Sequence, residues 1–191
     1  MPKSYLEREI EEQQAVDAEK LAAVAPSFDQ LLAACAVSIR SGGKILLFGN
    51  GGSASDAQHL ATEMTVRFVK NRAPIAAVAL TTDTSTLTAI GNDLGFDQLF
   101  SRQIRALGRT GDVAIGISTS GRSSNVLAGL RAAKEMDILP AAFGGGDGGD
   151  LVGLADPLIL IPSTTIARIQ EMHIAVGQML CGALEIELGL V

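Results

Sequence analysis

One short segment constrains this chain more than any other: an apolar run that ends abruptly in glycines. Residues 44–48 read Lys-Ile-Leu-Leu-Phe, and residues 49–52 follow as Gly-Asn-Gly-Gly. A helical pattern opens directly afterwards at Ser53, so the segment predicts a buried strand, a glycine turn and a helix. Such a turn directs free backbone N–H groups and the positive end of the helix dipole at whatever lies above it. We therefore expect an anion at this turn, such as a phosphate.

Short apolar runs alternate with helical patterns through most of the chain. We expect strands at Ile45–Phe48, Ile75–Leu80, Val113–Ile117, Pro140–Phe143 and Leu158–Ile161. We expect helices at Ser53–Lys70, Thr84–Ile90, Phe96–Leu107, Ser123–Glu135 and Thr164–Leu188. Strands this apolar, separated by helices, indicate a parallel sheet covered on both faces. The pattern predicts a three-layer α/β/α sandwich, in which ligands bind at the carboxyl ends of the strands.

The first 41 residues have a helical pattern only. Ser4 to about Val24 forms one expected helix, Pro26 interrupts it, and Ser27 is the expected cap of a second helix that runs to about Ser41. The length of 191 residues fits one domain. We expect a single domain over 1–191, with an N-terminal helical segment at 1–41 and an α/β core at 42–191.

The composition argues against several classes of protein. A net charge of −6 and a sequence pI near 4.9 argue against a nucleic-acid partner, because phosphate-backbone binding needs a basic face. The N-terminus has no apolar signal region and no apolar run reaches membrane length, so we expect a soluble cytoplasmic protein. Both cysteines, Cys35 and Cys181, fall in expected helices, which favours reduced thiols in the core.

A second turn follows the strand expected at Val113–Ile117. Residues 118–124 read Ser-Thr-Ser-Gly-Arg-Ser-Ser, directly before a helix. Hydroxyls and glycine at a helix N-terminus supply side-chain and backbone donors to a phosphate. An ordinary serine-capped turn is the alternative. The turn lacks the Gly-Lys-Ser/Thr ending of a P-loop, and the first turn lacks the third glycine of a dinucleotide fingerprint, which would fall at Ala54.

A few polar residues on the helices are candidates for the chemistry. His59 and Glu63 lie four residues apart, so they share one helix face and can bind a metal or transfer a proton, although a structural histidine is the alternative. Gln170 and Gln178 lie eight positions apart, about 80° around a helix, and can face one site. Asn92 and Asp93, expected in a loop between two helices, can meet the hydroxyls of a sugar; a helix-capping turn is the alternative.

Taken together, these motifs resemble the phosphoheptose (sedoheptulose 7-phosphate) isomerases of the SIS superfamily. The resemblance covers nearly the whole chain and rests on stretches that occur in the family's order: Gly49–Ser53, Asp56–His59, Glu63, Thr88–Asp93, Phe100–Gln103, Ile117–Gly121, Asp147–Gly149 and Arg168–Glu171. It implies the SIS fold with a five-stranded parallel sheet. It also implies a homotetramer with shared active sites, the N-terminal helices packing against partner subunits. The implied reaction interconverts sedoheptulose 7-phosphate and D-glycero-D-manno-heptose 7-phosphate, a step toward the heptose of lipopolysaccharide or capsule.

The resemblance also assigns roles to residues. It implies that the phosphosugar is bound by Asn50, Gly51, Gly52, Ser53, Glu63, Asn92, Asp93, Ser118, Thr119, Ser120, Ser123 and Gln170. Within this set, Ser118, Thr119, Ser120 and Ser123 would hold the phosphate. Glu63 would be the general base that moves a proton between C1 and C2 through an enediol. One zinc ion per subunit would be held by His59, Glu63, Gln170 and the residue at position 178.

Position 178 departs from the family. The family has a histidine there, which serves as metal ligand and as second acid/base, whereas this chain has Gln178. An amide does not titrate near neutral pH, and zinc generally prefers an imidazole nitrogen to an amide oxygen. Ala167 is a second departure, since some relatives carry a substrate-facing aspartate at that position.

Two alternatives to this function stay open at the level of sequence. A related tetramer of the superfamily is a non-catalytic protein that binds the replication initiator DnaA, and it lacks both the helix carboxylate and the last-helix histidine. This chain keeps the first as Glu63 and lacks the second. An isomerase for a different phosphosugar is the other alternative, because nothing in the sequence counts the carbons of the substrate.

Overall fold

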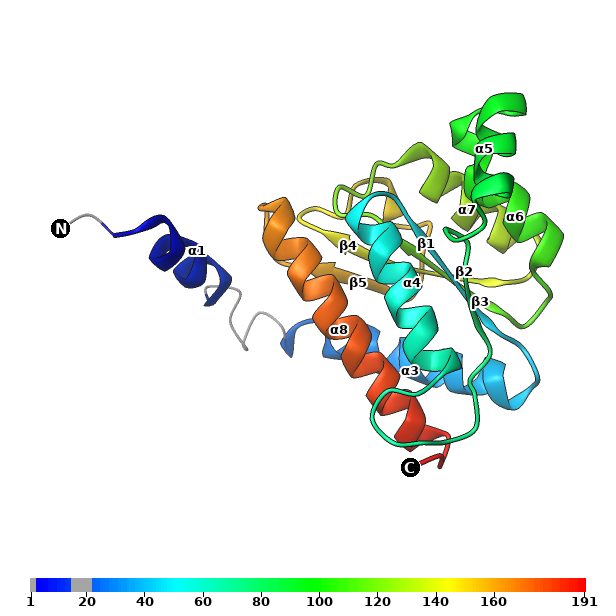
Figure 1. Ribbon diagram of the computed structural model, residues 1–191, viewed down its shortest axis with the longest axis horizontal. Helices are drawn as coiled ribbons and strands as arrows, with labels where there is room; N and C mark the ends of the chain where they lie inside the picture. Colours follow the sequence, from blue (N-terminus) through cyan, green and yellow to red (C-terminus); the bar gives the residue numbers. More distant parts are fainter. Residues whose placement is uncertain (1–2, 15–21) are drawn as a thin grey trace.

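Five parallel strands form the centre of the molecule. The structure is a computed structural model that describes residues 3–14 and 22–191 (Figure 1). The strands lie in the order β2-β1-β3-β4-β5, and every neighbouring pair is parallel. Their bounds are Ile45–Gly49 for β1, Ala77–Ala79 for β2, Val113–Ile117 for β3, Leu139–Gly145 for β4 and Leu158–Ile161 for β5.

Helices cover both faces of this sheet, which confirms the three-layer prediction. One face packs on α3 (Ala25–Arg40), α4 (Gly52–Thr65) and α8 (Ile166–Glu187). The other packs on α5 (Thr84–Asp93), α6 (Leu99–Leu107) and α7 (Ser124–Glu135), with short 3₁₀ turns at Phe96–Gln98 (η1) and Gly149–Leu151 (η2). Figure 1 shows α1 (Tyr5–Gln14) extending away from these layers.

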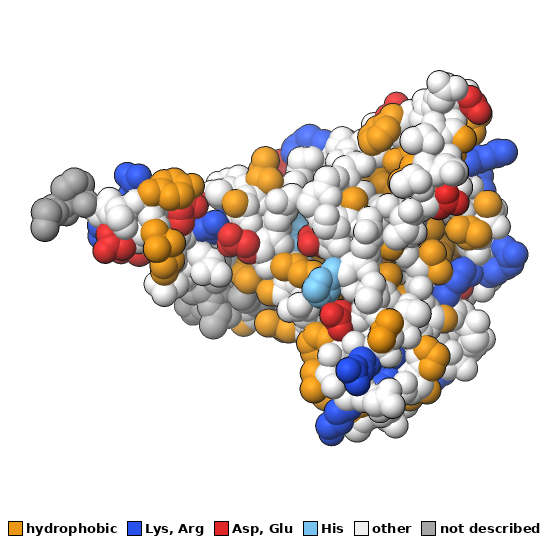
Figure 2. All heavy atoms as spheres, in the orientation of Figure 1, with side chains coloured by type: hydrophobic (Ala, Val, Ile, Leu, Met, Phe, Trp, Pro, Cys, Tyr) orange, Lys and Arg blue, Asp and Glu red, His pale blue; other side chains and the backbone are white. Residues whose placement is uncertain are grey.

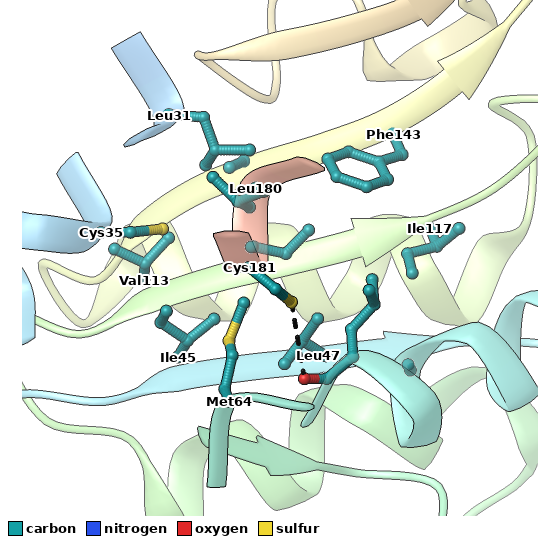
Figure 3. Close-up of a cluster of buried hydrophobic side chains, with 14 of the residues drawn as sticks. Leu31, Cys35, Ile45, Leu47, Met64, Val113, Ile117, Phe143, Leu180 and Cys181 are labelled. Carbon is teal, nitrogen blue, oxygen red and sulfur yellow. Dashed lines mark hydrogen bonds between the residues drawn. The ribbon is translucent and has the colours of Figure 1, made fainter. Parts of the chain in front are cut away.

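Alternation along the strands divides the apolar side chains between two cores. Ile45 and Leu47 enter the core beneath α4 and α8, whereas Leu46 and Phe48 enter the opposite one, because successive strand residues point to opposite faces. Figure 3 shows the first core, in which the Cys181 thiol approaches the carbonyl oxygen of Leu60 at 4.0 Å.

Both cysteines are buried and free, as predicted. Burial raises the pKa of the Cys35 and Cys181 thiols to about 12, so both stay protonated at neutral pH. They act as small apolar side chains of the core.

The observed elements differ from the predicted ones mainly at their ends. The helix expected to reach Lys70 ends at Thr65, and the strand expected from Ile75 begins at Ala77. The predicted cap at Ser27 is wrong: α3 already begins at Ala25 and takes Pro26 into its first turn, where proline is tolerated. The first helix begins at Tyr5, one residue after its predicted start. The part predicted at 15–21 lies outside the described residues, and Ala23 and Val24, predicted as helix, form a turn.

The described helices include none that is both long and apolar enough to cross a membrane. Helix α1 instead exposes a short apolar stripe of Tyr5, Leu6 and Ile10. It has no buried residues and reaches the body of the molecule through a hydrogen bond of 2.7 Å from Arg168 Nη1 to the carbonyl oxygen of Glu9. A ten-residue helix is marginal alone in water, so this stripe is the part of α1 available for packing.

Buried His173 fastens α8 to the sheet. Its Nε2–H donates to the carbonyl oxygen of Gly144 at 3.0 Å, and its ring packs on Phe143. Burial lowers the pKa of His173 from 6.5 to about 4, which outweighs the opposite effect of the Gly144 hydrogen bond. The folded protein therefore holds this side chain neutral.

We expect the free energy of unfolding to fall as the pH drops from about 6.5 to about 4. In this window the unfolded chain binds a proton at His173 and the folded chain does not, which costs up to about 3 kcal/mol at the acidic end. Denaturant titrations at several pH values measure the loss. His173→Gln, which keeps a donor for Gly144 but does not titrate, should flatten the curve over this window; parallel curves for the two proteins would contradict the assignment.

Candidate active site

The glycine turn after β1 forms as predicted and opens α4. Gly51 has a φ of 54°, a conformation that suits glycine, and α4 begins at Gly52. A Cβ atom on Gly52 would lie 2.7 Å from Nε2 of Gln170. Because Gly52 has no side chain, the Gln170 side chain of α8 can lie against this turn. Gly52 and Gln170, both predicted to bind the substrate, are therefore neighbours.

The serine turn after β3 lies next to the glycine turn. Gly49 pairs with Ile117 in the parallel ladder, so both turns leave the same carboxyl edge of the sheet. Ser118 is buried and its hydroxyl donates to Ser123 Oγ at 3.1 Å, while Thr119 and Ser120 are more open. Ser123 is the N-cap of α7, yet its side chain makes no capping hydrogen bond. The N-terminal amides of α7 and these hydroxyls form a set of donors suited to a phosphate.

The loop after β4, residues 146–150, packs against the serine turn and holds it in place. Gly121 has a φ of 65°, and a Cβ atom there would run into the carbonyl oxygen of Gly148. Asp150 N–H donates to the Gly121 carbonyl at 3.0 Å. Arg122 donates to Asp147 at 2.7 Å and to the Ser120 carbonyl at 3.0 Å. The hydrogen bond from Arg122 lowers the pKa of Asp147, so this carboxylate stays charged and holds the loop against the turn.

Asn125 joins the two turns, and the sequence analysis missed it. Its Nδ2 donates to Asn50 Oδ1 at 2.9 Å, and Asn50 Nδ2 donates to Asn125 Oδ1 at 2.8 Å. Asn50 was predicted to contact the sugar, and this amide pair fixes its direction. The only available signal was that asparagine is a weak helix former. In the structure Asn125 is buried, and Asn50 supplies the partner that its amide needs.

A second cluster, which we call the helix cluster, consists of His59, Glu63 and Gln178. His59 Nε2 lies 3.3 Å from Glu63 Oε1 and 3.3 Å from Gln178 Nε2. The side chains of His59 and Glu63 are 47% and 24% exposed, so substrate or a metal ion can reach them. Figure 2 shows a histidine and an acidic side chain together on the face that α4 and α8 form.

Close contact between α4 and α8 builds this cluster. The two helices run in the same direction, since Gly52 lies against Gln170 and His59 lies against Gln178. A Cβ atom on Gly177 would lie 2.5 Å from Leu60 Cδ1, so the helices approach closely only because residue 177 is glycine. One turn before His59, Oδ2 of Asp56 is buried without a hydrogen-bond partner among the described residues, and burial raises the pKa of this carboxyl.

The turns and the helix cluster are separated within one chain. Gln170 and Gln178 both face α4, as their rotation predicts, but eight residues of helix put them about 12 Å apart along α8. Glu63 lies eleven residues after Gly52, about 16 Å along α4. One chain therefore brings together His59, Glu63 and Gln178, and it brings together the two turns with Gln170, but it does not unite the two groups.

Asn92 and Asp93 lie apart from both groups. They occupy the last turn of α5, so the prediction of a loop at these residues is wrong; the helix continues past Ile90 to Asp93. Asn92 Nδ2 donates to Asp93 Oδ1 at 2.7 Å, and both side chains are exposed. They are free to meet a ligand that approaches from outside the chain.

The fold and the two turns define a protein of the SIS domain class. A model of the SIS domain family matches residues 10–145. A phosphoheptose isomerase of Paramagnetospirillum magneticum is 56% identical over 182 residues, covering 95% of each sequence, and one of Burkholderia pseudomallei is 49% identical over 184 residues, covering 95% of this chain and 93% of the relative. This chain belongs to the phosphoheptose isomerases, a family of enzymes.

Solved structures agree with the sequences. The phosphoheptose isomerase of Neisseria gonorrhoeae superposes with a TM-score of 0.87 at 44% identity, over 94% of this chain and 97% of that one. The phosphoheptose isomerase of Francisella tularensis superposes with a TM-score of 0.91 at 34% identity, over 95% and 96%. The predicted five-stranded SIS fold is thereby confirmed, and the isomerase hypothesis is supported over the non-catalytic alternative.

Gly121→Ala should weaken phosphate binding by about tenfold or more, because the new Cβ displaces the serine turn from its brace and misplaces its donors. The KM for phosphosugar and the inhibition constant of inorganic phosphate measure the effect. Gly153→Ala is the matched control: its φ is 78°, but a Cβ atom there meets nothing within 4 Å. Similar kinetics for the two variants would mean that the brace does not shape the anion site.

Proposed function

We propose that this protein interconverts sedoheptulose 7-phosphate and D-glycero-D-manno-heptose 7-phosphate through an enediol. The observation that carries the proposal is that one chain, 56% identical to a phosphoheptose isomerase, contains both an anion cradle at the carboxyl edge of the sheet and the His59–Glu63 pair on α4. A place in heptose biosynthesis for lipopolysaccharide or capsule, and a cytoplasmic location, stay predictions.

The serine turn holds the phosphate in this proposal. Ser118, Thr119, Ser120 and Ser123 supply hydroxyls, and the start of α7 supplies amides and the positive end of its dipole. Each charge-assisted hydrogen bond to the dianion contributes roughly 1.5–3 kcal/mol. The neighbouring glycine turn, with Asn50, Gly51, Gly52 and Ser53, lines the sugar together with Gln170, Asn92 and Asp93.

Glu63 is the general base. Its carboxylate removes the proton from C1 of the ketose while the C2 carbonyl oxygen gains a proton, which gives the enediol. Glu63 then returns its proton to C2, and the C1 hydroxyl loses its proton as the aldehyde forms, so no redox partner is needed. The proton that moves between the two oxygens needs a second carrier, and Gln178 has no titratable proton to offer.

One zinc ion per subunit fits part of the helix cluster. His59 Nε2 and Glu63 Oε1 are a nitrogen and an oxygen ligand of the kinds that zinc binds. Gln178 presents its NH₂ group to His59, so its amide group has to flip by about 180° before the carbonyl oxygen faces a metal. Bound zinc would polarise the sugar carbonyl and stabilise negative charge on its oxygen.

We further propose that the complete site forms between subunits of a homotetramer. About 10 Å of helix separates Gly52 from His59. This separation supports a site in which a second copy of the chain supplies Gln170 as the fourth zinc ligand and the serine turn that holds the phosphate. Exposed apolar side chains on α1 and on the outer face of α8, including Leu6, Ile10 and Met179, support such an assembly.

Glu63→Gln should lower kcat for isomerisation by 10²-fold or more, because glutamine keeps the shape of the side chain but cannot act as a base. A coupled assay with sedoheptulose 7-phosphate, with and without zinc, measures it. Glu135→Gln, at an exposed ion pair with Arg105, is the matched control and should stay fully active. Full activity of Glu63→Gln would overturn the mechanism, and an inactive unmodified protein would favour the interaction-protein alternative.

The same variant tests the shared site. Refolding Glu63→Gln subunits together with Gly121→Ala subunits should recover part of the activity, because some sites then take an intact base from one chain and an intact phosphate turn from another. No recovery at any mixing ratio would place the whole site in one chain.

Gln178→His should raise kcat by at least about tenfold and tighten zinc binding, since an imidazole adds a proton carrier and a preferred ligand beside His59. Steady-state kinetics and competition with a zinc chelator measure the two effects. Gln178→Leu, which removes the amide without adding an imidazole, should weaken zinc binding and should not raise kcat. A Gln178→His protein unchanged in both properties would put residue 178 outside the site.

An isomerase for another phosphosugar is the second candidate. Asn92 and Asp93, the predicted sugar ligands that lie apart from both groups, are exposed, so they set no limit on the length of the sugar in the single chain. Comparing kcat/KM for phosphosugars of five, six and seven carbons separates the candidates.

A further inference from the structure

A buried ion pair holds the end of α4 against α8. The side chains of Arg72 and Glu185 are only 1% and 3% exposed, and Arg72 Nε donates to Glu185 Oε1 at 2.7 Å. Arg72 lies in the segment between α4 and β2, and Glu185 lies near the end of α8. Removing two charges from water is costly, so a pair this deep needs further hydrogen bonds.

Arg72 makes those hydrogen bonds with the C-terminus of α4. Its Nη2 donates to the carbonyl oxygen of Glu63 at 2.9 Å, and its Nη1 donates to that of Met64 at 2.6 Å. The last carbonyls of a helix lack partners within it and carry the negative end of the helix dipole. A guanidinium is suited to this position because its planar fork reaches both carbonyls and the Glu185 carboxylate at once.

Glu185 completes the connection from α8. Its Oε1 also accepts the backbone N–H of Phe68 at 2.9 Å, so it holds the chain directly after α4. Glu185 follows Gln178 by seven residues, and therefore lies on the same face of α8. One ion pair thus ties the backbone of Glu63 to the α8 face that carries Gln178.

We propose that Arg72 and Glu185 are positioning residues that hold the Glu63 carboxylate in register with Gln178 and the sugar carbons. The inference rests on the proposed role of Glu63 as the base. A misplacement of about 1 Å at a reacting group costs as much as 10²-fold in rate. The serine turn that is proposed to hold the phosphate lies at the start of α7 and, within the described part of the chain, makes no hydrogen bond with Arg72 or Glu185. Loss of the ion pair should therefore lower kcat and leave KM nearly unchanged.

Two variants separate positioning from a merely structural role. Arg72→Lys keeps the charge but cannot reach Glu185 and both carbonyls together, and kcat should fall about tenfold or more with KM within about threefold. The double variant Arg72→Met, Glu185→Leu replaces the buried pair by apolar side chains of similar size, which commonly preserves or raises stability. We expect it to recover most of the melting temperature that Arg72→Lys loses, yet to keep the low kcat.

The control is Glu187→Gln, which removes an exposed ion pair with Arg40 near the same end of α8. Its melting temperature and kcat should match those of the unmodified protein. If the double variant recovers kcat together with melting temperature, or if Arg72→Lys is fully active, the positioning role is wrong. An unmodified protein without isomerase activity would instead remove the proposed function, so the two failures are distinguishable.

Discussion

The parallel pairing of β1 with β3 is the constraint on which the rest of the structure depends. Five residue pairs, from Ile45 with Val113 to Gly49 with Ile117, bring two strands to the same edge of the sheet at the same level. Each strand then ends in a turn that opens a helix, so two helix N-termini and two sets of backbone donors lie next to each other. The amide pair of Asn50 and Asn125 holds the two turns in this relation.

The second requirement is a precise spacing of α4 and α8. The carboxylate, imidazole and amide of the helix cluster come from two helices, α4 and α8, that pack directly against each other. A buried histidine fastens α8 to the sheet at Gly144, and a buried ion pair ties its far end to the end of α4. Helix α8 is therefore held at two points, by His173 in its first half and by Glu185 near its C-terminus.

Much of the fold was predictable from the sequence, and so were the turns. The strands Val113–Ile117 and Leu158–Ile161 have the predicted bounds, because a short apolar run between turn residues identifies a buried strand. The end of α4 was not predictable, because a contact from outside the helix accompanies it: Arg72 donates to the carbonyl oxygens of Glu63 and Met64 in its last turn. A buried arginine reads in a sequence like an exposed one, so the ion pair with Glu185 had no signal at all. The sequence spacing of Gln170 and Gln178 correctly predicted that both face the same side of α8. It did not indicate that the rise along the helix keeps the two amides apart.

The contact between Gly177 and Leu60 has a consequence for how this site can change over evolutionary time. Gly177 has no side chain and takes no part in any reaction, yet a methyl group there would meet Leu60 and push α8 away from α4. The neighbouring residue, 178, presents its side chain across the gap that Gly177 keeps narrow. A lineage can therefore exchange the chemical group at position 178, imidazole for amide or the reverse, without redesigning the scaffold. Such an exchange at position 178 is possible only while residue 177 remains glycine.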